Sequence, residues 1–225
     1  FRVEGWTAHH PQQAGRQVVR GVDFRVRRGE IVGIAGLMGA GRTEFAMSVF
    51  GRSYGRDISG RAFMDGKPVD VSTVPRAIAA GLAYVTEDRK HLGLLLGQDI
   101  ARNVTLANLP GVSRHLVIDD MRELQVAERY RGQMRVRCSG VHQEAGTLSG
   151  GNQQKVVLGR WLSLAPRAIV FDEPTANVDP ERAAGLMRDI MAAATDERGD
   201  DSRTVIVISH LPVPDDLVTQ RVRLA

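Results

Sequence analysis

The sequence predicts an α/β domain that is built on a mainly parallel β-sheet. Apolar runs of strand length recur along the 225 residues without polar alternation, which is typical of strands covered on both faces. Helix-like segments separate these runs, as in a sheet with crossover helices. A glycine-rich turn joins the first run to a helix. The predicted strands are residues 31–35, 82–86, 168–171 and 204–208.

The predicted helices carry local start signals. Pro75 occupies a first-turn position, and Asp179-Pro180 introduces a later helix. The predicted helices are residues 42–50, 75–80, 119–131, 152–164 and 181–194. Residues near 90–147 contain helix-like stretches and no strong strand run, which predicts a separate helical lobe. We expect a single domain over 1–225, with an α/β core at 1–88 and 148–225 and the helical lobe at 89–147.

The composition excludes several classes of protein. With 43% hydrophobic and 25% charged residues the chain suits a globular domain, and no apolar stretch approaches the ~20 residues that cross a bilayer. Cys138 is the only cysteine, so a reduced, cytoplasmic compartment is expected. The net charge of +4 is spread among acidic residues, which predicts a mixed surface and no nucleic-acid partner. The chain starts at Phe1 without Met or a signal-like leader, so we interpret it as an excerpt of a longer polypeptide.

The glycine-rich turn is the first candidate binding site. It follows a predicted strand and opens a helix, so its backbone amides can converge on phosphate oxygens, and glycine lets the phosphates approach. Thr43 stands where such a loop supplies a Mg²⁺ ligand, but Arg42 replaces the lysine that normally reaches the terminal phosphates. Arginine is bulkier and planar, so binding should survive better than turnover. The expected nucleotide-binding residues are Gly36, Gly39, Ala40, Gly41, Arg42, Thr43 and Glu44.

Two carboxylates follow the strand at 168–171. Asp172 is expected at the carboxyl edge of the sheet beside the glycine turn, where it can hold Mg²⁺ through water. Glu173 lies next to it and is the candidate general base that orients or deprotonates the water attacking the γ-phosphate. The plainer alternative for Glu173 is an acidic helix cap.

A second anion site is predicted at Ser149, Gly150 and Gly151. These residues precede a helix, so their amides lie at its positive end. The stretch Leu148-Ser-Gly-Gly-Asn-Gln-Gln-Lys155 resembles the signature of ATP-binding cassette (ABC) proteins. Ala176-Asn-Val-Asp179 resembles their D-loop, and His210 resembles the switch histidine that contacts the γ-phosphate. The resemblance implies a P-loop NTPase core with an N-terminal antiparallel β region and a helical ABC-specific lobe.

A further segment resembles a subfamily marker. Tyr84-Val-Thr-Glu87-Asp88-Arg89-Lys90 is similar to the Glu-Asp-Arg-Lys segment in the second ATP-binding half of monosaccharide importers of the ribose, xylose and galactose type. Most ABC ATPases have glutamine where Glu87 stands, and that residue contributes to Mg²⁺ binding and to signalling toward the membrane subunit. A carboxylate there is a second departure, besides Arg42, from the family pattern.

The resemblance implies a function that is shared between subunits. ATP and Mg²⁺ would be the cofactors, and a second ATP-binding half would close head to tail on this one. Ser149 and Gly151 would complete a competent site on that partner, whereas the site of Arg42 and Glu87 would hydrolyse weakly. The other partners implied are transmembrane permease subunits and, indirectly, an extracytoplasmic sugar-binding protein, so the chain would lie peripherally on the cytoplasmic face of the inner membrane.

Three alternatives stay open. The chain could be a non-hydrolysing module that only regulates closure, or a soluble ABC ATPase that acts on nucleic acid or ribosomes. Arg42 could also reflect a general arginine bias, because only Lys67, Lys90 and Lys155 among the 30 basic residues are lysine. For adenine stacking the sequence offers Trp6 and the pair His9-His10, and core packing or surface exposure is the favoured interpretation of these three.

Overall fold

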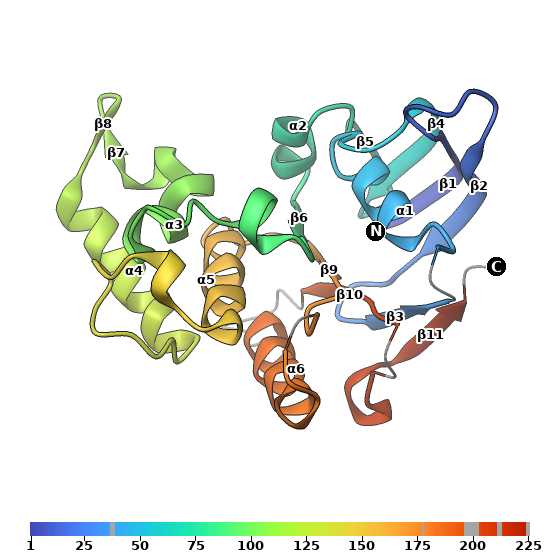
Figure 1. Cartoon of the computed structure of the whole chain (residues 1–225). Coiled ribbons are helices and arrows are strands. Elements are labelled where there is room, and N and C mark those ends of the chain that lie inside the picture. The colour runs from blue at the N-terminus through green and yellow to red at the C-terminus, as the bar shows by residue number, and fades with distance from the viewer. Residues whose placement is uncertain (37–38, 177, 196–202, 211–212, 224–225) are drawn as a thin grey trace. The chain divides into compact units, whose positions relative to one another are not determined.

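In the computed structural model of the protein, the described residues are 1–36, 39–176, 178–195, 203–210 and 213–223. Their contacts divide the chain into two compact units (Figure 1). Unit 1 comprises Phe1–Tyr84, Pro166–Glu173 and Glu197–Ala225, and unit 2 comprises Val85–Ala165 and Pro174–Asp196. Leu37 and Met38 of the glycine turn and Asn177 of the D-loop-like segment lie outside the described residues. Each unit is described by itself.

The larger sheet of unit 1 is the predicted parallel sheet. Its strand order is β11-β3-β10-β9-β6, and β10 pairs in parallel with both β3 and β9. The strands are β3 (Ile31–Ala35), β6 (Leu82–Val85), β9 (Ala168–Asp172), β10 (Thr204–Ile208) and β11 (Gln220–Arg223). Every residue of β9 and β10 is buried, as their unbroken apolar runs predicted. The prediction of a mainly parallel sheet is therefore confirmed.

A second sheet of unit 1 is antiparallel, as the family resemblance implied. Its order is β2-β1-β4-β5, and its strands are β1 (Arg2–His9), β2 (Gln17–Arg25), β4 (Arg56–Met64) and β5 (Lys67–Val69). The helices of this unit are α1 (Arg42–Val49) and α2 (Val74–Ala79). Trp6 is buried and its indole Nε1 donates to Ser48 Oγ at 2.9 Å, which ties β1 to α1.

Unit 2 is predominantly helical. It contains α3 (Ile100–Thr105), α4 (Asp120–Gln133), α5 (Gly150–Leu162) and α6 (Pro180–Thr195), with α3 packed against both α4 and α5. Shorter turns are η1 (Arg89–Gly93), η2 (Leu106–Val112), η3 (Ala145–Thr147), and in unit 1 η4 (Asp215–Leu217). Arg160 of α5 donates to the Asn103 backbone oxygen and to Asn103 Oδ1, at 2.7 and 2.8 Å, and burial lowers the pKa of this guanidinium to about 10.

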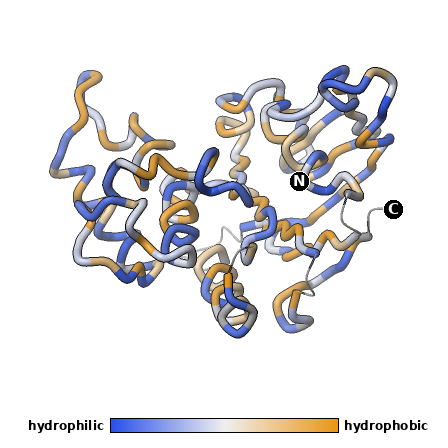
Figure 2. Tube along the Cα trace, viewed as in Figure 1, coloured by the Kyte–Doolittle hydropathy of each residue, from blue (hydrophilic) through white to orange (hydrophobic). Residues whose placement is uncertain are grey.

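A small hairpin, β7 (Ser113–Arg114) and β8 (Val117–Ile118), projects from unit 2. Figure 2 colours its tip as hydrophobic, and the side chain of Leu116 there is fully exposed. Strands of two residues are too short to produce a recognisable apolar run, so the sequence did not reveal this hairpin. No helix of the described residues is long and apolar enough to cross a membrane.

Candidate nucleotide-binding site

The described part of the glycine turn, Gly36 and residues 39–41, leads from β3 into α1 as the sequence predicts. It begins directly after β3, and Gly41 caps α1 in the left-handed region at φ 79°. A Cβ on Gly41 would lie 2.5 Å from the backbone oxygen of Val18, so no other residue fits. Phe45 N donates to the Gly41 oxygen at 2.8 Å, which starts the helix. The first amides of α1 therefore remain at the turn, where an anion can bind them.

Asp172 and Thr43 meet at the carboxyl edge of the parallel sheet. Asp172 ends β9 and is fully buried, and Thr43 Oγ1 donates to its Oδ1 at 3.0 Å. Tyr84 Oη donates to the other oxygen, Oδ2, at 2.6 Å. Two hydroxyl groups therefore orient this carboxylate. The sequence indicated Asp172 and Thr43 but not Tyr84, because the pairing of β6 beside β9 is a tertiary feature.

Glu173 is held by His210 on two sides. The His210 backbone N donates to Glu173 Oε1 at 2.8 Å, and His210 Nδ1 lies 2.8 Å from Oε2. Because an ionised carboxylate only accepts, the proton of this contact belongs on Nδ1. Glu173 adopts φ 45° and donates its own N–H to Ile208 O at 2.9 Å, so its backbone continues the pairing with β10. The structure thus brings the two predicted catalytic residues together.

Arg42 turns toward the same carboxylate. It is 6% exposed, its Nη1 donates to Ser209 O at 2.7 Å, and its Nη2 lies 3.7 Å from Glu173 Oε1. The guanidinium therefore binds a protein carbonyl and faces the candidate general base. A compact ammonium could not reach both groups in the same way.

The residues at the sheet edge fit a Mg²⁺ ion. Thr43 and Asp172 offer a hydroxyl and a carboxylate, the hard oxygen donors that Mg²⁺ prefers, and Mg²⁺ usually takes only one or two protein ligands besides phosphate and water. Among the described residues no group of three His, Cys, Asp or Glu side chains could hold a metal on its own. The third predicted metal residue, Glu87, is exposed and belongs to unit 2.

A cavity with a volume of ≈ 350 Å³ lies beside the glycine turn. Gly39, Ala40, Gly41 and the predicted binding residue Glu44 line it, together with Arg16 and residues of strand β2 such as Val18. None of the residues considered for adenine stacking lines this cavity. Trp6 is in the core, and His10 Nδ1 accepts from the backbone N–H groups of Gln12 and Gln13.

The second predicted anion site lies at the start of α5 in unit 2. Ser149 is the N-cap residue and is exposed, and its Oγ accepts from Asn152 Nδ2 at 3.0 Å, not from the helix amides. Gly151 lies in the first turn. Asp179 of the D-loop-like segment is exposed as well, and its Oδ1 accepts from Glu181 N at 2.9 Å at the start of α6.

The Glu-Asp-Arg-Lys segment has one buried member. Glu87, Asp88 and Lys90 are exposed, whereas Arg89 is 7% exposed. Asp88 caps η1 by accepting from His91 N at 3.1 Å, and this hydrogen bond, together with the His91 side chain, lowers the pKa of Asp88. The sequence marked the segment but did not single out Arg89.

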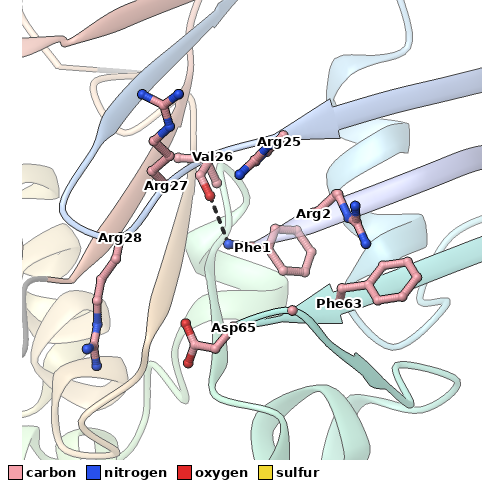
Figure 3. A pocket seen from close by; sticks show the side chains of 9 residues that line it. Phe1, Arg2, Arg25, Val26, Arg27, Arg28, Phe63 and Asp65 are labelled. Atoms are coloured by element: carbon pink, nitrogen blue, oxygen red, sulfur yellow. Dashed lines mark hydrogen bonds between the residues drawn. The ribbon is translucent and has the colours of Figure 1, made fainter.

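Unit 1 also contains a cavity that shares no residue with the glycine turn (Figure 3). Its volume is ≈ 330 Å³, and four arginines, Arg2, Arg25, Arg27 and Arg28, line it together with Phe1, Phe63 and Asp65. Arg2 lies over the Phe63 ring at 4.3 Å and pairs with Glu4 at 3.1 Å. Because Phe1 N donates to Val26 O at 2.9 Å across this cavity, the start of the chain forms one of its walls.

The fold and the glycine-turn site define the chain as an ATP-binding cassette of the ATPase class. The solved structure of MJ1267, an ATP-binding cassette of an ABC transporter, superimposes with a TM-score of 0.79 at 21% identity and covers 100% of this chain and 87% of that one. The cassette MJ0796 in a dimeric post-hydrolysis state with ADP and Pi gives 0.77 at 19% identity, covering 99% and 93%. The family model described as ABC transporter matches residues 19–176. The chain therefore belongs to the ABC transporter family.

Curated relatives are also similar. The L-arabinose transport ATP-binding protein AraG of Geobacillus stearothermophilus is 52% identical over 179 residues, which are 80% of this chain and 35% of that protein. The xylose import ATP-binding protein XylG of Geobacillus kaustophilus is 40% identical over 89% of this chain and 39% of its own length. The ribose import ATP-binding protein RbsA 3 of Rubrobacter xylanophilus is 44% identical over 84% and 37%. The chain spans little more than a third of each relative.

Proposed function

We propose that the chain is one ATP-binding half of a monosaccharide importer. The relatives named for arabinose, xylose and ribose transport support this substrate class. The observation that carries the ATPase chemistry is the cluster at the sheet edge, where Thr43, Asp172, Glu173 and His210 lie in hydrogen-bond contact with one another in pairs. Binding of ATP would drive closure onto a second half, and closure would move the attached permease subunits.

Each residue of the cluster has a proposed task. The amides of the glycine turn bind the phosphates, and Thr43 and Asp172 hold Mg²⁺, which when bound supplies positive charge to the phosphate oxygens. Glu173 orients the attacking water and accepts its proton at a carboxylate oxygen. His210 holds Glu173 in place through Nδ1 and its backbone N–H. Glu87 remains a predicted metal residue in this assignment.

We assign weakened hydrolysis to this chain's own glycine turn. Arg42 and His210 both contact the Glu173 carboxylate, so each of its two oxygens already has a protein partner that competes with the attacking water. To reach a terminal phosphate, Arg42 must leave Ser209 O and Glu173, and these contacts then compete with the nucleotide. The competition supports slow turnover with retained binding.

Arg42→Lys tests this assignment. The shorter ammonium cannot hold Ser209 O and Glu173 together, so single-turnover hydrolysis with the companion half present should rise by roughly one order of magnitude. Arg56→Lys, an exchange at an exposed position at the start of β4, should leave the rate unchanged. An unchanged rate in Arg42→Lys would show that Arg42 does not limit hydrolysis. Its presence would then be explained by the general preference of this chain for arginine over lysine.

Two alternatives differ in what they predict. A purely regulatory module would bind ATP and close but release no phosphate in a single turnover, even with lysine at position 42. A soluble ATPase acting on nucleic acid would bind RNA or DNA with a steep salt dependence and would not co-purify with a permease. Co-purification with permease subunits at the cytoplasmic face of the inner membrane, in a complex that responds to a sugar-loaded extracytoplasmic binding protein, would support the importer.

A further inference from the structure

Arg89 carries a buried positive charge directly beneath the start of α5. Its Nε donates to Gln153 Oε1 at 3.2 Å and its Nη1 donates to Ala176 O at 3.3 Å. The Gln153 amide is itself held, because its Nε2 donates to Ala145 O at 3.3 Å. Arg89 therefore joins three segments of unit 2: η1, the first turn of α5, and the D-loop-like segment that begins at Ala176.

The Arg89 guanidinium contacts the signature loop, which we define as residues 149–151. A Cβ placed on Gly150 would lie 2.7 Å from Arg89 Nη2. The backbone of the loop thus runs in contact with the third nitrogen of the guanidinium. A side chain at position 150 would displace the guanidinium.

No carboxylate neutralises Arg89 within the part of the chain that the structure describes. Both of its acceptors are neutral oxygens, and no ion pair of these residues includes it. A buried cation without an anionic partner is costly, and an anion bound at the adjacent loop would offset that cost. The amides at the N-terminus of α5, a helix of 13 residues, favour negative charge near this loop as well.

We propose that Arg89 is a positioning residue that holds the signature loop and adds the positive charge with which the loop receives the terminal phosphates of an ATP bound by the partner half. The inference rests on the proposed function, since it requires a second half that closes on this one. It assigns a task to the buried member of the Glu-Asp-Arg-Lys segment: Arg89 would act on the partner's nucleotide through the signature loop.

The local structure delivers Arg89 to this position. Asp88 caps η1, and Arg89 is its first residue. At the other end of η1, a Cβ on Gly93 would lie 3.3 Å from Val157 Cγ2 of α5 and 3.1 Å from Arg89 Cβ, so the turn packs closely against the helix that carries the loop. A shift of the segment would therefore move the guanidinium relative to the signature loop.

The test uses the assembled importer and compares Arg89→Gln, Arg89→Lys and the control Arg102→Gln. Arg102 is an exposed residue of α3 in the same unit, with its Nη1 donating to Gln98. Loss of one charge-assisted contact corresponds to about tenfold, so Arg89→Gln should raise the ATP concentration for half-maximal hydrolysis by roughly that factor. Arg89→Lys should recover most of the loss, and Arg102→Gln should match the native protein.

Nucleotide binding to the chain's own glycine turn provides the second readout. Mg-ATP affinity of the chain alone should be the same in all variants, because Arg89 acts on the partner's nucleotide. Equal midpoints for Arg89→Gln and Arg102→Gln, or equal losses for Arg89→Gln and Arg89→Lys, would show that the charge plays no part and overturn the inference. An assembled native protein without sugar-stimulated hydrolysis would instead overturn the proposed function.

Gln153→Ala covers the case in which Arg89→Gln does not assemble. It removes the acceptor of Arg89 Nε while keeping the charge, so the guanidinium loses its alignment. The half-maximal ATP concentration should then rise in the same direction as for Arg89→Gln, by a smaller factor. A midpoint equal to that of the native protein would contradict a positioning role.

Discussion

Asp172 is a fully buried carboxylate whose orientation depends on two hydroxyl groups, those of Thr43 and Tyr84. Tyr84→Phe removes one hydrogen-bond donor to this buried carboxylate, so we expect the free energy of unfolding to fall by about 1–3 kcal/mol. Urea unfolding measures this change. Tyr54→Phe is the matched control, because no hydrogen bond from the Tyr54 hydroxyl is present among the described residues, and an equal loss in both variants would refute the role of Tyr84.

Arg16 lies in the wall of the cavity beside the glycine turn, where the nucleoside part of ATP would project from its bound phosphates. A guanidinium face can stack on a base, so Arg16→Ala should weaken Mg-ATP binding several-fold, by about 1 kcal/mol. Calorimetry with inorganic tripolyphosphate is the control, since this ligand has no base. Equal weakening of both ligands would mean that Arg16 acts through its charge on the phosphates.

At the scale of single residues, the sequence predicted what depends on neighbours in the chain. Asp172 ends a buried strand, and the edge rule for parallel sheets predicted its place near the glycine turn, where it accepts from Thr43. The sequence did not predict the contact between Arg42 and Ser209, because these residues are 167 positions apart in the chain. Nor did it identify Arg89, whose burial arises from the packing of η1 on α5. Such contacts follow from tertiary packing that residue type alone does not encode.

At the scale of elements, the glycine turn and strand β2 fit together so closely that Gly41 has no substitute. Gly41→Ala should destabilise the protein more than Gly15→Ala, although both glycines have φ values in the left-handed region, 79° and 77°. At Gly15 nothing lies within 4 Å of an added Cβ, so only the backbone cost of about 1–2 kcal/mol applies.

Urea unfolding of the two variants measures the difference. At Gly41 the Val18 oxygen must move as well, which adds a steric cost and distorts the turn. Mg-ATP affinity should therefore fall in Gly41→Ala and stay native in Gly15→Ala. Equal destabilisation would show that the turn can move away from β2 without penalty.

The boundaries of the elements show which of them hydrophobic periodicity in the sequence can predict. β3 and β10 have the predicted bounds because their runs carry no charged residue and are buried at the centre of β3 and throughout β10. α5 begins at Gly150, two positions before the predicted 152, since the glycines were interpreted as a loop while the backbone is already helical. The π-turn η1 has no periodic signature in five residues, so only its Asp88 cap could have suggested it.

At the scale of the whole molecule, the glycine turn and the signature loop belong to different units of one chain, and the proposed closure has each serve a different nucleotide. Ser149→Arg should therefore leave Mg-ATP binding by the chain intact and abolish hydrolysis in the assembly, because an arginine side chain blocks the partner's phosphates. Thr43→Ala should weaken binding itself, since Thr43 and Asp172, which lie in hydrogen-bond contact, are the proposed metal ligands.

Thermal unfolding of the chain with Mg-ATP separates these effects. Ligand at about 100 times its Kd stabilises a protein by about 2.7 kcal/mol, so native protein and Ser149→Arg should show the same rise in Tm, and Thr43→Ala a smaller one. Ser139→Arg, an exposed position in the same unit, controls for the added charge and should retain hydrolysis. If Ser149→Arg lost the Tm rise while Ser139→Arg kept it, the signature loop would contribute to the chain's own nucleotide, and the division of tasks between two chains would be wrong.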